Sequence, residues 1–241
     1  MATQESMLKK VRDAVSDLRS SSPPLPEVPK VWPLEGLAID ELANRFRTNL
    51  EAVAGEVVFC NNLTEATNRI TELLTATDSH RLAVLDHPLS RDVAERLESE
   101  GKELMFAPTD ATAVSAETLA TFDAALMSPE LLLCDTGSCL FTAQTTFDRL
   151  TTYITPLSIA IASRSMLREN LPQAWAELKD RFETPQTGEF VIVTGPSRTA
   201  DIEKILILGV HGPKRLVVLL VDEFVTPHDG QPENRCTEAQ Q

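Results

Sequence analysis

The sequence has few cysteines, few basic residues and no long apolar run, and each shortage excludes a class of protein. Four cysteines in 241 residues are too few and too scattered for a disulfide scaffold. The formal charge of -14, from 22 basic and 36 acidic residues, would repel a phosphate backbone and an anionic membrane alike. No apolar run approaches the roughly 20 residues of a membrane span, and the amino terminus lacks the apolar core and the cleavage site of a secretory signal. We therefore expect a cytoplasmic protein that binds neither nucleic acid nor a membrane.

Common cofactor and metal motifs are missing as well. There is no Gly-x-Gly-x-x-Gly, no Walker lysine loop and no nucleophile elbow, so a dinucleotide oxidoreductase, an NTPase or an α/β-hydrolase has no support. The histidines show no ligand spacing with one another or with the cysteines, which argues against zinc; they are His80, His87, His211 and His228. We expect no bound metal and no cofactor.

The first 33 residues predict an amphipathic arm and a proline-rich linker. Apolar residues from Met7 to Leu18 fall on one face of a helix. Five prolines between positions 23 and 33 favour an extended chain over a packed element. We expect residues 1–33 to precede an α/β domain at 34–222, and residues 223–241, which lack periodicity, to be loosely held.

From residue 40 onward, helical and strand-like patterns alternate, which is typical of an open α/β fold. With 42% hydrophobic content, the chain can bury one substantial core. Ser90 and Ser115 are predicted to cap the third and fourth of the helices. Helices are expected at 40–53, 64–74, 90–101, 115–127 and 172–182, and strands at 56–60, 81–85, 103–107, 131–134, 139–142 and 159–162. The predicted fold is a three-layer α/β open sheet whose strands are mostly parallel.

The stretch from Phe190 to Val221 predicts a compact βαβ unit. An apolar strand at 190–193 leads into a polar elbow at 194–199. A helix then begins at Ala200 and ends at Gly209, and 216–221 supplies a second strand. Strand, helix and strand in this order imply a parallel sheet.

Ligands of open α/β sheets bind beyond the carboxyl ends of the strands, where Asp86, the turn 135–137 and the elbow 194–199 are all expected to emerge. At the elbow, a helix start, two hydroxyls and Gly195 would together form a cradle for a small anion, with Arg198 as a clamp. The alternative is a simple helix cap without a ligand, in which Asp201 holds Arg198 in position. Asp201 itself would oppose an anion unless it points away.

Two further positions have both a functional and a structural interpretation. His211, in a glycine-rich turn, is a weak candidate for a general acid or base, or else a turn histidine bonded to the backbone. The turn at 135–137 either contacts a ligand or only reverses the chain. The candidate ligand-binding residues are Asp135, Thr136, Gly137, Thr194, Gly195, Ser197, Arg198, Thr199, Asp201 and Gly212.

Residues 194–203, Thr-Gly-Pro-Ser-Arg-Thr-Ala-Asp-Ile-Glu, followed by Leu-Gly-Val-His-Gly-Pro at 208–213, resemble the signature of the lactate-utilisation protein C family, the LUD domain. The block beginning at Asp135 also resembles that family, so the similarity spans roughly residues 40–222. The resemblance implies a fold similar to the ribose-phosphate isomerase, CoA-transferase and formyltetrahydrofolate cyclo-ligase group. It supplies no catalytic residues.

The resemblance also implies a bacterial role in the oxidation of L-lactate to pyruvate, alongside iron–sulfur partner subunits. The chain itself has only Cys134-x₄-Cys139, without the further Cys-x₂-Cys of a plant-type cluster, so we expect it to carry no cluster. We therefore expect an accessory subunit. The alternative is a small-molecule transferase or ligase that acts on a phosphate, CoA or folate compound, and the sequence leaves open whether the chain is an enzyme.

Overall fold

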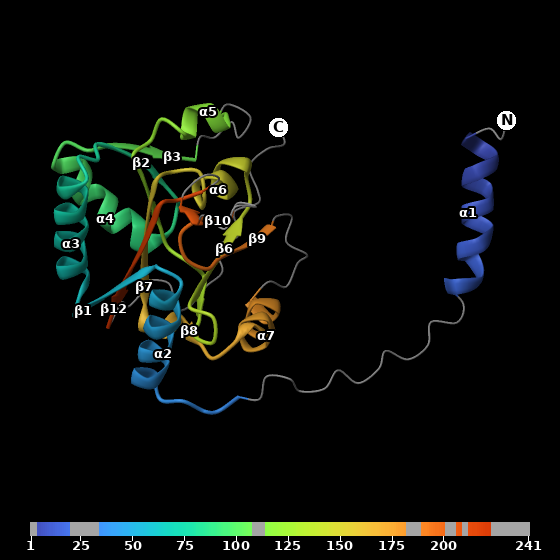
Figure 1. Cartoon of the computed structure of the whole chain (residues 1–241), viewed down its shortest axis with the longest axis horizontal. Helices are drawn as coiled ribbons and strands as arrows, with labels where there is room; N and C mark the ends of the chain where they lie inside the picture. Colours follow the sequence, from blue (N-terminus) through green and yellow to red (C-terminus); the bar gives the residue numbers. More distant parts are fainter. Residues whose placement is uncertain are drawn as a thin grey trace, which may run out of the picture. The chain divides into compact units, whose positions relative to one another are not determined.

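The structure is a computed structural model that describes residues 4–19, 34–107, 114–181, 189–200, 206–208 and 212–222 (Figure 1). Helix α1, Gln4–Arg19, belongs to the first of two units of the chain. Its apolar residues Met7, Leu8 and Val11 are exposed. The second unit begins at Leu34. The expected linker at 20–33 and the tail from 223 lie outside the described residues.

Six described strands form the main sheet, and every neighbouring pair is parallel. Their spatial order is β1-β12-β7-β4-β2-β3. Their bounds are β1 Glu56–Cys60, β2 Arg81–Val84, β3 Glu103–Phe106, β4 Ala124–Met127, β7 Leu157–Ser163 and β12 Arg215–Val221. The central strands are almost continuous apolar runs because both of their faces are buried.

Helices α3, Leu63–Ala76, and α4, Pro88–Ser99, cover one face of this sheet. The helices place apolar side chains such as Ile70 and Val93 against Leu82 and Leu219 of the strands. Asn62 caps α3 by accepting the Glu65 N–H, and Gly101, at φ +86°, follows the end of α4. Both helices were expected, α3 from its apolar spacing and α4 from a cap at Ser90 and a stop at Gly101.

The opposite face is covered by helix α2, Ile39–Ala52, and by a second sheet. This sheet has the strand order β8-β5-β6-β9 and carries α7 on its outer side. Within the second unit, Figure 1 shows α3 at the left and α7 to the right of β8. The bounds are β5 Leu131–Leu133, β6 Ser138–Ala143, β8 Leu167–Arg168, β9 Glu189–Val193, α7 Leu171–Arg181 and the 3-10 turn η1 Arg164–Met166. The short helices α5, Ala116–Leu119, and α6, Thr146–Thr151, complete this layer. The expected three-layer α/β architecture is confirmed.

The helix expected at 115–127 is wrong beyond its first turn. Ser115 caps it as predicted, by accepting the Thr118 N–H at 3.2 Å, but the helix ends at Leu119. Residues 124–127 form the buried strand β4 between β2 and β7. Asp123 fixes this strand by accepting the His80 and Arg81 N–H groups at 2.8 and 2.9 Å. Short apolar runs fit both a helix and a strand, and sheet pairing decided the outcome. Similarly, α4 begins at Pro88 with His87 as its cap, not at Ser90.

The predicted βαβ unit at 190–221 is also wrong. Strand β9 belongs to the second sheet and β12 to the main sheet. Between them, β10, Arg198–Ala200, pairs antiparallel with β11, Leu206–Leu208, where a helix was expected. The run Leu206-Ile207-Leu208 suits a strand as well as a helix. Residues 201–205 and 209–211 lie outside the described part.

Within the described segments, no helix is long and apolar enough to cross a bilayer.

Glu169 fixes the chain that leads into α2. It is 6% exposed and accepts the N–H groups of Glu35, Gly36 and Leu37 at 2.5, 2.7 and 3.1 Å. These donors, that of Glu35 first, hold the pKa of Glu169 below its ordinary value of 4.5. The ionised form is therefore the one that stabilises the fold.

We predict that Glu169→Gln lowers the melting temperature at neutral pH by several degrees, because the amide loses part of its acceptor capacity. A lowered pKa gives stability that is present above pH 4.5 and is lost as the pH falls below it. The difference from the unsubstituted protein should therefore shrink in acid. Glu98→Gln, at an exposed position of α4, is the control and should have little effect at any pH. A difference that stays constant in acid would contradict this account.

Candidate functional site

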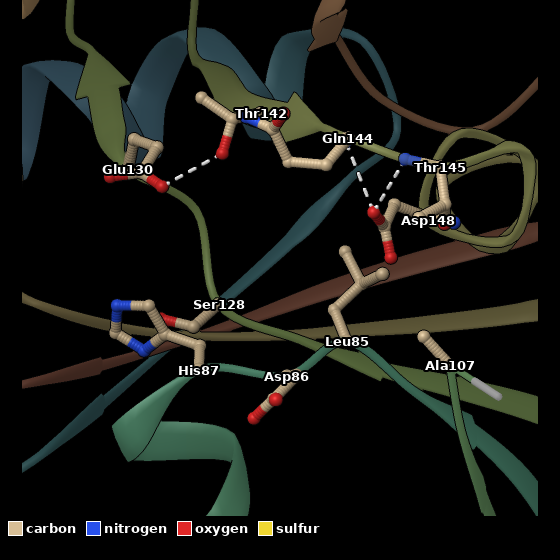
Figure 2. Close-up of a pocket in the computed structure, with 10 residues that line it drawn as sticks. All are labelled: Leu85, Asp86, His87, Ala107, Ser128, Glu130, Thr142, Gln144, Thr145 and Asp148. Carbon is tan, nitrogen blue, oxygen red and sulfur yellow. Dashed lines mark hydrogen bonds between the residues drawn. The ribbon is translucent and has the colours of Figure 1, made fainter. Parts of the chain in front are cut away.

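A cavity of about 340 Å³ opens beyond the carboxyl ends of β2, β3 and β4 (Figure 2). The residues after these strands form its floor, and β6 with the start of α6 forms its roof. The described lining consists of Leu85, Asp86, His87, Ala107, Ser128, Glu130, Thr142, Gln144, Thr145 and Asp148. Its volume is in the range of small-molecule sites.

The sheet topology accounts for the position of this cavity. From β2 the chain passes through α4 to β3 on one face, where Leu82 and Val84 pack against α4. From β3 it returns through α5 to β4 on the other face, where Ala83 packs in the cluster of α5 and α6. The chain thus leaves β2 toward α4 on one face, and it leaves β4 toward the second sheet on the other face. Since β2 and β4 are neighbours, this divergence opens a crevice between their ends.

His87 caps α4 through its ring. Its Nδ1 accepts the Leu89 N–H at 3.2 Å, so in the neutral ring Nε2 carries the proton. Burial lowers the pKa of His87 from 6.5, although Glu130 and Asp86 act in the opposite direction. The ring is therefore neutral at pH 7 and presents an N–H donor. With Nδ1 occupied in this way, Nε2 has no lone pair with which to accept a proton.

Ser128 directly follows β4 and is 7% exposed. Its Oγ finds no hydrogen-bond partner in the part of the chain that the structure describes. Figure 2 shows its side chain on the same side of the cavity as the His87 ring. A buried hydroxyl without a partner costs about 1–3 kcal/mol, so a ligand that bonds to it would remove this cost.

The carboxylates of the cavity are held in different ways. Asp86 is neutralised by Arg91, whose Nη2 donates to Oδ2 at 2.7 Å and whose Nε donates to Oδ1. Glu130 Oε1 accepts the Thr142 hydroxyl at 2.9 Å. Asp148 Oδ2 accepts the N–H groups of Gln144 and Thr145 at 3.0 and 2.9 Å. Figure 2 shows these last contacts as dashed lines. None of the described lining residues is a lysine or an arginine, so the cavity favours positive charge.

The predicted turn at 135–137 joins β5 and β6, as expected, but it packs against α2. Asn49 Nδ2 donates to the carbonyls of Cys134 and Asp135 at 2.7 and 3.1 Å. Gly137 has φ +66°, and a Cβ there would lie 2.3 Å from Leu50 N. Glycine is required at this position because α2 approaches so closely.

Thr136 and Thr194, predicted from distant parts of the sequence, meet around Ser138. The Ser138 hydroxyl donates to Thr136 Oγ1 at 2.7 Å and lies 2.7 Å from Thr194 Oγ1. The structure therefore brings the turn and the elbow together. The contact is a chain of hydroxyls within the second sheet.

The elbow at 194–199 and Asp86 lie at different ends of the sheet. This corrects the expectation that Asp86, the turn at 135–137 and the elbow form one site beyond the carboxyl ends of the strands. Ser197 N–H donates to the Pro213 carbonyl at 2.8 Å, just before β12 begins. A Cβ at Gly195 would lie 2.9 Å from the Val53 carbonyl, and one at Gly212 would lie 2.9 Å from Ser197 Cβ. The elbow thus lies where the parallel strands start, whereas Asp86 lies where β2 ends.

The expected anion cradle also lacks its helix, because Arg198 and Thr199 begin a strand. Only the backbone of these two residues is described. Asp201 and His211 lie outside the described residues. Their predicted roles remain predictions.

Sequence reasoning named Asp86 but missed the other polar residues of the cavity. The available signal was a set of polar residues directly after strands, as in Asp86-His87-Pro88 and Ser128-Pro129-Glu130. The second of these was hidden because 124–127 was assigned to a helix. Thr142 and Asp148 reach the cavity from the second sheet and α6 through tertiary packing.

The thiols of Cys60, Cys134 and Cys139 are buried. Burial raises the pKa of Cys60 to about 11 and those of Cys134 and Cys139 to about 12. They are therefore protonated at neutral pH, whereas metals bind the thiolate. Among the described residues, no group of three or more His, Cys, Asp or Glu side chains is arranged to hold a metal ion.

The fold and the cavity together define an open three-layer α/β protein with a pocket at the reversal of its strand order. The LUD domain model matches residues 43–221. The chain belongs to the LUD domain family.

Individual relatives cover smaller parts of the chain. Lactate utilization protein C of Geobacillus thermodenitrificans is 30% identical over 98 residues, which are 39% of this chain and 40% of that protein. The uncharacterized protein YkgG of Escherichia coli is 27% identical over 139 residues, 54% of this chain and 57% of that protein. The chain thus spans about 40% of the length of the first of these relatives. A DUF162 family protein from Deinococcus radiodurans has a similar fold, with a TM-score of 0.53 at 16% identity over 77% of this chain and 99% of that chain.

We predict that Gly137→Ala destabilises the protein by about 3–4 kcal/mol, from left-handed backbone strain plus overpacking against α2. Gly101→Ala is the matched control, because Gly101 also has positive φ but a Cβ there would meet nothing within 4 Å. It should cost only about 1–2 kcal/mol. Urea unfolding measures both. Equal losses would show that the contact with Leu50 contributes nothing.

We predict that Ser128→Ala leaves the unliganded protein about 1 kcal/mol more stable, because it removes a buried polar group without a partner. Thr142→Val, in the same cavity, removes the hydrogen bond to Glu130 and should cost about 1 kcal/mol. The two changes therefore have opposite signs in urea unfolding. Destabilisation by Ser128→Ala would mean that its hydroxyl has a partner in the free protein.

Proposed function

We propose that the chain is a cytoplasmic accessory subunit in the oxidation of L-lactate to pyruvate, that it works with iron–sulfur partner subunits, and that it carries no cluster itself. The observation that carries the proposal is membership of the LUD domain family together with relatives named Lactate utilization protein C. Since these matches cover about 40% of each relative, activity and partners are inferred for this chain.

The chemistry of the described residues supports an accessory role. Oxidation of lactate removes two electrons and two protons, and it requires a base and an electron acceptor. In the cavity, His87 presents an N–H donor and no free lone pair. The thiols of Cys134 and Cys139 have pKa values of about 12, which disfavours the thiolates that a cluster needs. We place the redox step in the partner subunits.

Helix α1 supports the involvement of partners. Its residues Met7, Leu8 and Val11 are 60%, 47% and 57% exposed, which leaves an apolar stripe on a charged helix. Such stripes bind in grooves of other proteins. We infer that residues 1–33 are a docking arm, followed by the LUD domain at 34–222 and a tail at 223–241.

The alternative of a transferase or ligase for phosphate, CoA or folate compounds has less support. These compounds are anions, and the cavity presents Glu130 and Asp148 without a lysine or arginine in its described lining. The elbow, where an anion was expected, does not begin a helix.

The test is reconstitution with the iron–sulfur subunits of the lactate-oxidising system from the same cell. We predict that lactate-dependent reduction of a dye requires this chain. Leu8→Ser/Val11→Ser should weaken association roughly tenfold, equivalent to about 1.4 kcal/mol of lost apolar contact. Glu5→Ser/Lys9→Ser, which changes exposed polar residues of α1 without changing net charge, is the control. A full rate of lactate oxidation without this chain would refute the proposal.

A further inference from the structure

We propose that the cavity beyond β2, β3 and β4 binds a small organic cation in which a primary ammonium group and a hydroxyl group lie close together. This inference is independent of the lactate role, since it concerns a ligand of the isolated chain. It depends on the charge of the lining, on the Ser128 hydroxyl and on the donor that His87 presents.

The charge of the lining selects a cation. Of its three carboxylates, only Asp86 forms an ion pair with a base of the described segments, Arg91. Glu130 Oε2 and Asp148 Oδ1 accept no hydrogen bond from the described residues, since the described donors go to Oε1 and Oδ2. Figure 2 shows the second oxygen of Asp148 directed toward the middle of the cavity. Figure 2 shows Glu130 on the side of His87 and Ser128, and Asp148 on the opposite side of the cavity. An ammonium group has three donors and no acceptor, so it suits the free oxygen of Glu130, and the charge of Asp148 adds to the attraction.

The hydroxyl of the ligand is inferred from Ser128 and His87. Ser128 Oγ is buried and lacks a partner in the described residues, and it both donates and accepts. The neutral His87 ring offers its Nε2–H on the same side of the cavity. A ligand hydroxyl therefore accepts from His87 Nε2–H and donates to Ser128 Oγ. An acidic lining alone would not specify a ligand, whereas a buried hydroxyl without a partner calls for a polar group.

Other cations fit less well. Quaternary ammonium groups are bound by aromatic cages, and the described lining contains no Phe, Tyr or Trp. A metal ion needs several convergent ligands, and no such group of His, Cys, Asp or Glu is found among the described residues. The volume of about 340 Å³ accommodates a small molecule only.

Three compounds with one carbon skeleton test the proposal: 1-amino-2-propanol, propane-1,2-diol and L-lactate. They share the methyl group and the secondary hydroxyl, and they differ in a terminal ammonium, hydroxyl or carboxylate group. Each is titrated at neutral pH into the full chain labelled with ¹⁵N. The amides of Gln144 and Thr145, which donate to Asp148, and of Leu89, which donates to His87, report binding directly.

We predict saturable shifts at these three amides with the amine, binding at least roughly tenfold weaker with the diol, and no saturable shift with lactate. Glu130→Gln should weaken amine binding roughly tenfold, because it removes one charge and keeps the shape. Ser128→Ala should also weaken it. Ser158→Ala, which removes another buried hydroxyl without a described partner but lies outside the lining, should leave it unchanged.

Preference for lactate over the amine would overturn the proposal, as would equal binding of all three compounds. Amine binding that Glu130→Gln and Ser128→Ala leave intact would place the ligand elsewhere and would also overturn it. The absence of any shift at the three amides up to the solubility limit would mean that the cavity has no ligand of this class. These results come from the chain without partner subunits, so they stand apart from the outcome of the lactate reconstitution.

Discussion

Apolar side chains emerge from both faces of the central strands β4, β7 and β12, and their burial requires a cover on each side. Helices α3 and α4 cover one face, and α2 with the second sheet covers the other. Because successive connections must serve both faces, the chain reverses direction across the sheet between β3 and β4. After this reversal, the segments that follow β2 and β4 run to opposite faces of the sheet. The carboxyl ends of these two strands therefore stay open between them, and the cavity lies at that point. The site is therefore a consequence of how the core is buried.

The second sheet packs beside α2 on one face of the main sheet, and this packing explains the glycines in the segments that resemble the family signature. A sheet packed beside α2 needs close backbone approaches, which are provided at Gly137 against Leu50 and at Gly195 against Val53. The polar groups in these contacts are satisfied locally, by Asn49 for the carbonyls of the turn and by Ser138 for the two threonines. In the described structure these residues join layers of the fold, and they lie away from the cavity. Among the described residues of these segments, Gly137 and Gly195 thus make contacts between layers of the fold, and Thr136 and Thr194 meet through Ser138 within the second sheet.

The sequence predicted those elements in which the spacing of apolar residues matches the side chains that the fold buries. Helix α2 and strands β1 and β2 follow from periodicity and from short β-branched runs, and Gly101 ends α4 as its position suggested. The failures are segments of three or four apolar residues, 124–127 and 206–208, where helical and strand patterns coincide and long-range pairing decides. The first error also hid Ser128 and Glu130, since residues that follow a strand mark a site only once the strand is known. Thr142 and Asp148 reach the cavity from elements that packing alone brings there, so no local pattern points to them.

The charge of the cavity bears on how lactate would be handled. Lactate is an anion, and its oxidation at C2 needs a base near the hydroxyl as well as a cationic partner for the carboxylate. The cavity offers the opposite set. Its carboxylates Glu130 and Asp148 have no basic partner among the described residues, and the Nδ1 of its histidine is occupied by a backbone N–H. Lowering the pH would protonate His87 only below its ordinary pKa of 6.5, and the resulting ring would be an acid, not a base. The charge of the cavity therefore disfavours lactate, which agrees with the proposal that partner subunits oxidise it.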